Sequence, residues 1–585
     1  MRARRSAALS LACALFFALL ARVERAKAEL PTYSPFEQSV IAEELDKKQG
    51  QIEATPEGKR IESIEIARRD VLDERDPIPD IFNFFHVTTR EHVIRRELLF
   101  REGQRFDWAR VDETARNLRG LPQLSLVLIV PLTGSSPDRV RLLVVTKDVW
   151  SLRLNSNFQY GPEGLTYLFL NPTEWNLFGT HAMIGGLYSL RRSTYSLGLS
   201  LSHARIMGTR LAGSAALSLV FERKTSQAEG FIGVFNYGLP QYSARQRYFY
   251  GTALNLEDGI VRVSTQSAQD NQPILLSYHR ERYVARTSAT RSFGLVRKND
   301  LTLGIEADRR VYRSRVPGDV DPALRSEFES KEIPVSDTRV SPYLKLTHYE
   351  NRFLKTIELE TLGLQEDFRL GAELQTKVYV AGQRFGSSRN LLGVFSGVSY
   401  TVALGNGLVR GLVSSSIEYA DSARHQALAT AALRIATPRL GPGRFILDGV
   451  VENRFYNYLR NRSALGGEGR LRGYPASDLE AKGSSSQRGS DAMAFNAEFR
   501  SRAIEILSAQ CGMAAFFDMG AAAASMRQLS FRRSAGAGFR VLFPQADRLV
   551  LRLDWAVPFD DPRGKLPGAV FLTFGQAFTM PDFTN

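Results

Sequence analysis

The residues best suited to chemistry lie late in the chain, around a glycine-rich segment at 466–474 and three carboxylates. Glu468 lies inside this segment, while Glu498 and Asp518 follow it on stretches that alternate like β-strands. Carboxylates in such positions could act as the acid and base of a hydrolase built in a barrel. The glycines themselves suit a surface turn, whereas a nucleotide site is disfavoured because no strand-turn-helix context surrounds them.

Other signals of catalysis or metal binding do not occur in the sequence. The seven histidines form no His-Glu-x-x-His pair, and His86 and His92 have no acidic ligand pattern beside them. There is no Gly-x-Ser-x-Gly nucleophile motif, no P-loop and no cysteine pair. We therefore expect no enzyme activity, no cofactor and no metal site.

The first 28 residues predict a secretory signal peptide. Arg2, Arg4 and Arg5 precede a short apolar stretch, and Ala26 and Ala28 supply the small residues before a cleavage site. The apolar stretch is shorter than the roughly 20 residues that span a bilayer, which disfavours a membrane anchor. A lipoprotein site at Cys13 is also disfavoured, since cleavage there would cut the apolar region short.

The charge and cysteine content limit the possible classes further. The leader holds six basic residues and one acidic residue, so the formal net charge of +14 falls to +9 without it. The basic residues are scattered, and we expect no binding to nucleic acid. Only Cys511 remains after the leader, so the fold needs a large core or closed backbone pairing in place of a disulfide.

Residues 149–585 repeat segments of about ten alternating residues, punctuated by Gly, Asn, Asp and Ser, as in membrane β-barrels. A soluble β-sandwich or propeller is the alternative, which the leader disfavours. We predict an all-β antiparallel transmembrane barrel of about 16 strands, with the tally of segments lying between 16 and 20. The alternating segments include 152–160, 182–190, 195–203, 211–221, 301–307, 398–404 and 549–555.

Ahead of the barrel, residues 29–59 are polar and weakly patterned, which predicts a flexible arm. Residues 60–148 predict a compact α/β domain in the order β-α-α-β-β. A Thr-x-x-Glu capping box at Thr88 opens the first helix, which ends near Gly103, and Asp107 caps the second.

The stretches 94–107 and 116–121 of this domain resemble a POTRA domain, the periplasmic module of outer-membrane assembly and secretion proteins. The long link at 67–87 departs from the usual pattern and leaves the register of the first strand open.

The segment Leu471-Arg472-Gly473-Tyr474 resembles the Val-Arg-Gly-Tyr/Phe signature of the outer-membrane superfamily that contains BamA, TamA and the two-partner secretion transporters. Residues 494–500 and 515–520, the latter including Phe517 and Gly520, resemble the two strands that follow the signature loop. The resemblance implies that the loop at 461–490 folds into the lumen, where Glu498 and Asp518 hold Arg472. An arginine removed from water needs such partners.

The same resemblance implies a place in the bacterial outer membrane, with the POTRA domain in the periplasm. Implied partners are unfolded outer-membrane or secreted polypeptides, outer-membrane lipids, and periplasmic chaperones or an accessory complex. The implied role is insertion, folding or translocation of these polypeptides, through strand capture by the POTRA domain and by a poorly matched barrel seam. A dedicated exporter of one secreted partner and a passive pore remain alternatives.

Overall fold

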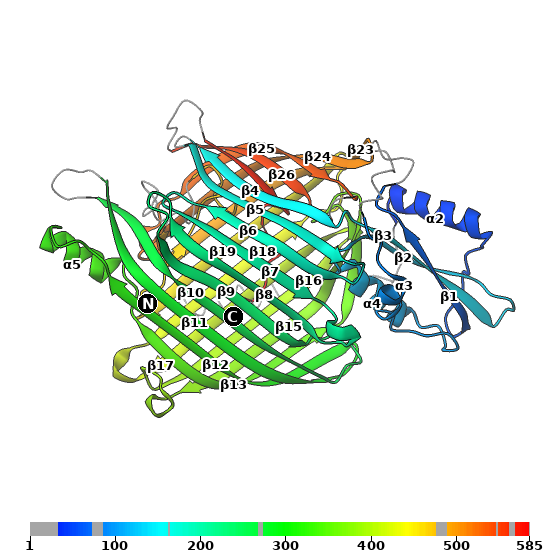
Figure 1. Ribbon diagram of the computed structural model, residues 1–585, viewed down its shortest axis with the longest axis horizontal. Helices are drawn as coiled ribbons and strands as arrows, with labels where there is room; N and C mark the ends of the chain where they lie inside the picture. Colours follow the sequence, from blue (N-terminus) through cyan, green and yellow to red (C-terminus); the bar gives the residue numbers. More distant parts are fainter. Residues whose placement is uncertain are drawn as a thin grey trace.

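A computed structural model of the chain describes residues 33–72, 86–161, 164–266, 273–474, 488–545, 548–560, 568–578 and 580–583. It consists of a large closed β-barrel with a small α/β module against one end (Figure 1). We call that end of the barrel the module end. The predicted signal peptide at 1–28 and most of the link at 67–87 lie outside the described residues.

The module follows the order β1 (Arg60–Arg69), α3 (Glu91–Arg95), α4 (Trp108–Arg119), β2 (Leu124–Thr133) and β3 (Arg139–Asp148), the element order expected from the sequence. Strand β3 lies in the middle of the sheet, parallel to β1 and antiparallel to β2. Asp107 caps α4 by accepting a hydrogen bond from the backbone N–H of Ala109 (2.9 Å). The apolar face of α4 then packs on the sheet.

The predicted capping box at Thr88 does not form, and α3 starts at Glu91 without a side-chain cap. The Thr88 hydroxyl instead donates to Asp70 (2.9 Å). The hydroxyl of the adjacent Thr89 donates to Asp148 (2.8 Å). The threonine hydroxyls that could cap α3 thus bond to aspartates distant in the sequence, and α3 is only five residues long.

The prediction of a flexible arm at 29–59 is wrong for its described part. Helix α2 (Pro35–Lys48) begins with a complete capping box between Ser34 and Glu37. Val40 and Ile41 are buried against the face of the sheet that α3 and α4 leave open. The apolar side of this helix is narrow, which is why its sequence looks weakly patterned.

The barrel wall is antiparallel throughout the described residues and closes between β27 and β4. Its strands are β4 (Leu152–Gly161), β5 (Gly164–Leu177), β6 (Ala182–Leu190), β7 (Thr194–His203), β8 (Ala212–Glu222), β9 (Ala228–Leu239), β10 (Tyr248–Gln266), β11 (Pro273–Phe293), β12 (Arg297–Ser314), β13 (Asp337–Glu350), β14 (Arg352–Ile357), β15 (Gln365–Ala381), β16 (Leu391–Leu404), β17 (Gly407–Ala420), β18 (Gln426–Ala436), β19 (Gly443–Asn457), β22 (Asp491–Ser501), β23 (Ile504–Ile506), β24 (Ala509–Ala523), β25 (Arg532–Leu542), β26 (Leu551–Pro558) and β27 (Ala569–Phe574). Helix α5 (Pro322–Lys331) lies beyond the wall at the end away from the module (Figure 1).

The estimate of about 16 strands is wrong: across the described ranges the barrel has 20. β13 and β14 both pair with β15, and β22 and β23 both pair with β24, so each couple is one interrupted strand. The estimate allowed too much loop per strand. Several turns at the module end are very short, as between Leu404 and Gly407.

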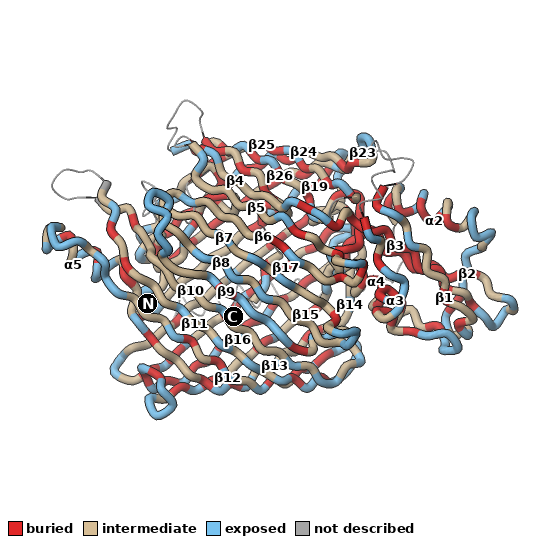
Figure 2. Tube along the Cα trace, in the orientation of Figure 1, coloured by how far each residue is buried: buried red, intermediate tan, exposed pale blue. Residues whose placement is uncertain are grey.

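Side chains alternate between the lumen and the outer surface along the wall. In β16, buried and exposed positions follow one another from Leu391 to Val398. In Figure 2 the colour changes from residue to residue along many strands, whereas β5 and β6 are mostly intermediate in burial. Among the described residues, no helix is long and apolar enough to cross a membrane.

The module is tied to the barrel by buried ion pairs. Glu97 of the module receives two hydrogen bonds from Arg205 (2.6 and 2.8 Å) and one from Arg210 (3.0 Å). On the other side of the module, Arg119 of α4 pairs with Asp367 of β15. Charge pairs on two sides of the module therefore set its orientation on the barrel end (Figure 1).

A neutral histidine lies in the same interface. Asp148 accepts hydrogen bonds from the Thr89 backbone (2.6 Å) and hydroxyl (2.8 Å), and it contacts His86 Nε2 at 3.2 Å. His181, in the turn before β6, places its Nε2 3.0 Å from the Thr89 hydroxyl. Since that hydroxyl donates to Asp148, His181 is the donor to Thr89. Burial, then Arg96 and His203, lower the pKa of His181 to about 3.

We expect docking of the module to weaken by about 2 kcal/mol between pH 7 and pH 5. Undocked His181, with its ordinary pKa of 6.5, takes up a proton in this range that the docked side chain excludes. Hydrogen exchange of residues 88–100 at the two pH values measures the change. His181→Gln should remove most of this dependence, since burial and Arg96 also lower the pKa of His203, and His92→Gln should keep it. A wild type insensitive to pH would contradict the assignment.

Candidate functional site

The loop between β19 and β22 enters the barrel and carries the glycine-rich segment. A short ladder between β20 (Ser463–Ala464) and β21 (Arg488–Gly489) joins its two sides. Gly466 and Gly467 have positive φ (123° and 71°), and the Gly467 N–H donates to the Tyr474 carbonyl (2.8 Å). The segment is thereby closed into a compact tip. Residues 475–487, the rest of the predicted inward loop, lie outside the described part.

Arg472 projects from this tip into three carboxylates, and all four side chains are fully buried. Its Nε and Nη2 donate to the two oxygens of Asp518 (2.8 and 3.0 Å), a bidentate contact. Its Nη1 donates to Glu498 (2.9 Å) and to Asp554 (3.0 Å). We call Arg472, Glu498, Asp518 and Asp554 the arginine lock.

The strands that supply the carboxylates explain the strength of the lock. Glu498 lies on β22, Asp518 on β24 and Asp554 on β26. A single guanidinium thus ties the loop tip to three strands of the wall. Breaking a buried ion pair of this kind costs roughly 3–5 kcal/mol, because an uncompensated charge is left behind.

Aromatic rings complete the surroundings of the guanidinium. The ring centre of Phe516 lies 3.4 Å from the Arg472 guanidinium carbon, and that of Phe578 lies 5.5 Å away. Phe516 comes from β24, whereas Phe578 belongs to the C-terminal segment after β27. The end of the chain therefore takes part in the site.

Gly473 and Tyr474 fix the loop tip against β26 and the turn that follows it. Gly473 has φ +92°, and a Cβ there would lie 3.1 Å from the Ala556 carbonyl oxygen. The Tyr474 hydroxyl donates to the Arg533 carbonyl (2.9 Å) and also contacts Asp560 (3.2 Å). Leu471 is buried in a small apolar cluster with Tyr474. All four motif residues are therefore packed inside the barrel.

Further arginines surround the lock. Arg540 and Arg552 donate to Asp554 (2.6 and 3.1 Å), and Arg500 donates to Glu498 (2.8 Å). Each of these carboxylates thus lies between at least two guanidinium groups. Together with Arg472, four arginines surround the three carboxylates of the lock, and Glu468 adds a fourth carboxylate 3.8 Å from Arg552.

Sequence reasoning brought Arg472, Glu498 and Asp518 together but missed Asp554 and Phe516. The strand at 549–555 had been expected, and its alternation places Asp554 on the same face as Arg552. That acidic residue on an inward position was a usable signal. Phe516 had a signal of the same kind, since alternation with an inward Asp518 places Phe516 inward and Phe517 outward.

The two remaining predicted residues lie around the lock and do not contact Arg472. Phe517 faces outward and is 39% exposed, as alternation with Asp518 requires. Gly520 faces the loop, and a Cβ there would lie 3.1 Å from Leu465 Cδ1. A glycine at this place lets the loop approach the wall closely.

The loop also reaches the first strand of the barrel. Both oxygens of Glu468 accept from the side-chain amide of Asn157 in β4 (3.1 and 3.2 Å). The Glu468 carbonyl accepts from Arg552 (3.1 Å). This contact joins β4 and β26 across β27, which lies between them in the wall.

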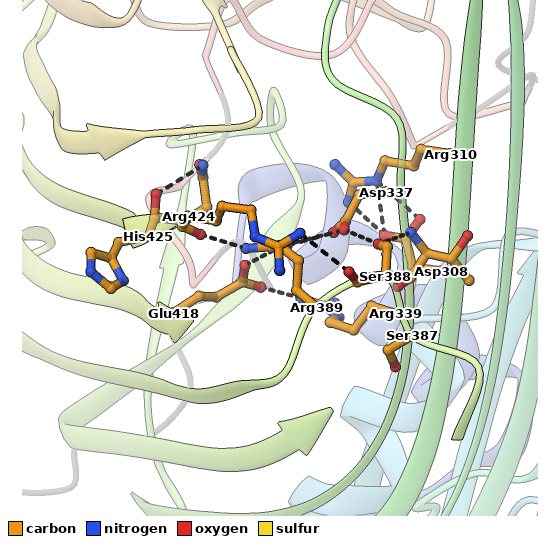
Figure 3. A network of polar contacts seen from close by, with 12 residues as sticks. Asp308, Arg310, Asp337, Arg339, Ser387, Ser388, Arg389, Glu418, Arg424 and His425 are labelled. Atoms are coloured by element: carbon orange, nitrogen blue, oxygen red, sulfur yellow. Dashed lines mark hydrogen bonds and ion pairs between the residues drawn. The ribbon is translucent and has the colours of Figure 1, made fainter. Parts of the chain in front are cut away.

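A second charged network lines the lumen nearer the end away from the module (Figure 3). Arg389 donates to Asp337 (2.7 Å) and Glu418 (3.0 Å), and Arg339 donates to Glu418 (2.5 Å). A polar cavity of about 350 Å³ adjoins these groups. Every arginine in the network has an acidic partner, so it fastens β13, β17 and the turn before β16 to one another.

Comparison with known proteins agrees with the sequence motif. Residues 461–578 match the Omp85 superfamily domain, which confirms the superfamily identified from Leu471–Tyr474. No curated protein matches the chain.

Among solved structures, BamA from Haemophilus ducreyi lacking POTRA domains 1-3 is 14% identical, with a TM-score of 0.32, over 95% of this chain and 96% of that chain. CdiB from Acinetobacter baumannii is 13% identical (TM-score 0.36; 92% of this chain and 80% of that chain). CdiB from Escherichia coli is 10% identical (TM-score 0.46; 90% and 80%). The assignment to the superfamily therefore rests on the domain match at residues 461–578.

We expect Arg472→Ala to destabilise the folded barrel by about 3–5 kcal/mol, because three carboxylates lose their common cation. Urea unfolding in liposomes measures the loss. Arg472→Lys should restore only part of it, since an ammonium cannot make the bidentate contact. Arg352→Ala removes a half-exposed pair with Glu350 and should cost less than about 1 kcal/mol. Equal costs for the two alanine variants would contradict the lock.

Asp554→Asn tests the residue that the sequence reasoning missed. The amide keeps the shape of the side chain but removes the charge that three arginines share. We expect a loss of about 3 kcal/mol in the same unfolding measurement. The matched control is Asp582→Asn, whose carboxylate is 76% exposed and should be nearly silent. A silent Asp554→Asn would show that Glu498 and Asp518 suffice.

Proposed function

We propose that this outer-membrane protein of the Omp85 superfamily helps other polypeptides to insert into the outer membrane, and that it does so at the seam between its first and last barrel strands. The observation that carries the proposal is the shortness of that seam. Within the described ranges β27 and β4 pair at three positions, Val570↔Tyr160, Phe571↔Gln159 and Leu572↔Phe158.

The seam leaves part of one strand edge without a strand partner. β4 pairs with β5 along its whole length, but on the other side its residues 154–157 pair with no strand within the described ranges. These residues lie at the module end. Unpaired N–H and C=O groups are costly next to hydrocarbon, so an incoming β-strand gains backbone hydrogen bonds by adding there.

The C-terminal segment explains why the seam stops early. The register of β27 would place residues 573–578 opposite 157–152 of β4 if the strand continued. The chain instead turns inward at Gly575 (φ +89°). The Phe578 carbonyl then accepts from Arg434 (2.9 Å), and the Pro581 carbonyl accepts from Arg410 (2.6 Å). The segment that could close the seam is held in the lumen.

In this proposal the arginine lock keeps one side of the seam rigid. It ties β22, β24 and β26 to the loop, whereas the described part of the loop reaches β4 through the Glu468–Asn157 contact. The neighbours of β27 are thus fixed, while β4 has fewer ties to them. Separation of β27 from β4 then costs only a few backbone hydrogen bonds.

The α/β module serves as a POTRA domain in the periplasm under this proposal. Its element order, and its place at the barrel end where the β4 edge is open, support that role. A polypeptide in extended form would meet the module before it meets the seam. Periplasmic chaperones or an accessory complex would supply such polypeptides. We expect the protein to act without bond chemistry and without a cofactor.

Export of a single secreted partner through the lumen is the second candidate. The loop tip, the C-terminal segment and the buried turn at Leu359 all occupy the lumen toward the module end. These segments would have to move before a chain could pass, and they also disfavour a passive pore. Insertion at the seam requires no such displacement.

The first test is the folding rate of an unrelated outer-membrane barrel into liposomes that contain this protein. We expect wild type to accelerate folding and Arg472→Ala, once shown to be folded, to accelerate it much less. Arg352→Ala should behave as wild type. No acceleration by wild type, together with ion conductance, would overturn the insertion proposal in favour of an exporter or pore.

A disulfide across the seam tests the site of action. Phe158→Cys with Leu572→Cys, a directly opposed pair, should abolish acceleration when oxidised and restore it when reduced. Phe539→Cys with Leu553→Cys joins two strands that the proposal keeps together, and should have no effect. Full activity of the oxidised seam variant would exclude opening at this seam.

A further inference from the structure

The outer surface of the wall carries a groove behind the arginine lock. It has a volume of about 640 Å³ and crosses β17, β18, β19, β22 and β24. Its lining is almost wholly apolar and includes Phe517, the motif residue that the lock does not use. The volume lies within the roughly 300–1,000 Å³ of ligand pockets.

Small residues form the floor of the groove. On β19, Gly449 lies between Leu447 and Val451, the two outward neighbours along that strand. Val451 is opposite Ala431 of β18, and Leu447 is opposite Ala497 of β22. Ala431, Gly449 and Ala497 therefore make a straight diagonal line across three strands. We call this line the furrow.

Larger side chains flank the furrow on both sides. Leu433 and Leu447 stand toward the module end, Val451 and Phe495 stand on the opposite side, and Phe517 lies beside Ala497. Alternate residues of a strand are about 7 Å apart, so the furrow is one side chain wide. A helix, with a diameter of roughly 10–12 Å, is too thick for it.

The apolar lining of the furrow also makes an extended peptide an unfavourable occupant. Backbone N–H and C=O groups placed in an apolar furrow would lose their hydrogen bonds to water without replacement. A hydrocarbon chain has no such groups. The furrow is continuous with the apolar outer surface that faces membrane hydrocarbon in an outer-membrane barrel.

We propose that the furrow binds one acyl chain of an outer-membrane lipid. The wall at this point is thin, because the floor residues carry at most a methyl group; the Phe495 ring lies beside Gly449, 3.3 Å from where a Cβ of that glycine would be. Directly inside it, between Leu447 and Gly449, the buried Asp448 pairs with Arg434 (2.8 Å) and Arg470. A bound acyl chain supplies the missing apolar packing outside these buried charges.

The test counts phospholipid molecules that stay bound to the detergent-purified protein after incubation with phosphatidylethanolamine vesicles, by native mass spectrometry. We expect one tightly held lipid on wild type. Ala431→Leu fills the furrow and should retain about tenfold less, since its side chain displaces methylene groups from apolar contact. The matched control is Ala285→Leu, an exposed position on β11 outside the furrow, and it should retain lipid as wild type does.

Equal retention by Ala431→Leu and wild type would overturn the proposal. A photoreactive benzoylphenylalanine in place of Phe517, a flanking residue that leaves the floor of the furrow open, gives a second readout in native outer membranes. A product with the added mass of a lipid supports the proposal. A crosslink to a polypeptide overturns it and identifies the furrow as a protein contact instead.

Discussion

The structure depends on the burial of one positive charge. Arg472 is fully removed from solvent, so its guanidinium must find carboxylates inside the barrel, and it finds three on three different strands. The ion pairs that Arg472 needs therefore hold the loop against three strands of the barrel wall. The compact glycine turn, the buried Tyr474 and the close approach at Gly520 all serve to bring the arginine to that place.

This restraint makes the barrel uneven around its circumference. β22, β24 and β26 are joined through the lock, whereas the adjacent strands β27 and β4 share three paired positions within the described residues. The C-terminal segment adds to the contrast, because Phe578 packs beside Arg472 instead of extending β27. The same inward turn that completes the lock thus leaves the edge of β4 open. The inward course of the C-terminal segment thus contributes both to the rigid set of strands around the lock and to the short pairing between β27 and β4.

The sequence predicted the parts that depend on local pattern. Alternation gave the barrel wall, and the motif at 471–474 with two downstream acidic residues gave most of the lock. It missed Asp554: alternation along the expected strand places this residue inward, but its position beside Arg472 depends on the strand order. It also missed helix α2, whose apolar side is only wide enough for Val40 and Ile41 to reach the module sheet.

By itself the sequence determined the class of fold through side-chain alternation. The resemblance of the 471–474 motif implied the lumen loop, and the cost of burying Arg472 then required acidic partners for it. Tertiary structure alone decided the number of strands, the register of the seam and the inward course of the C-terminal segment. These depend on which distant strands become neighbours when the barrel closes. Period-2 patterns are the same for every strand, so they cannot specify that choice.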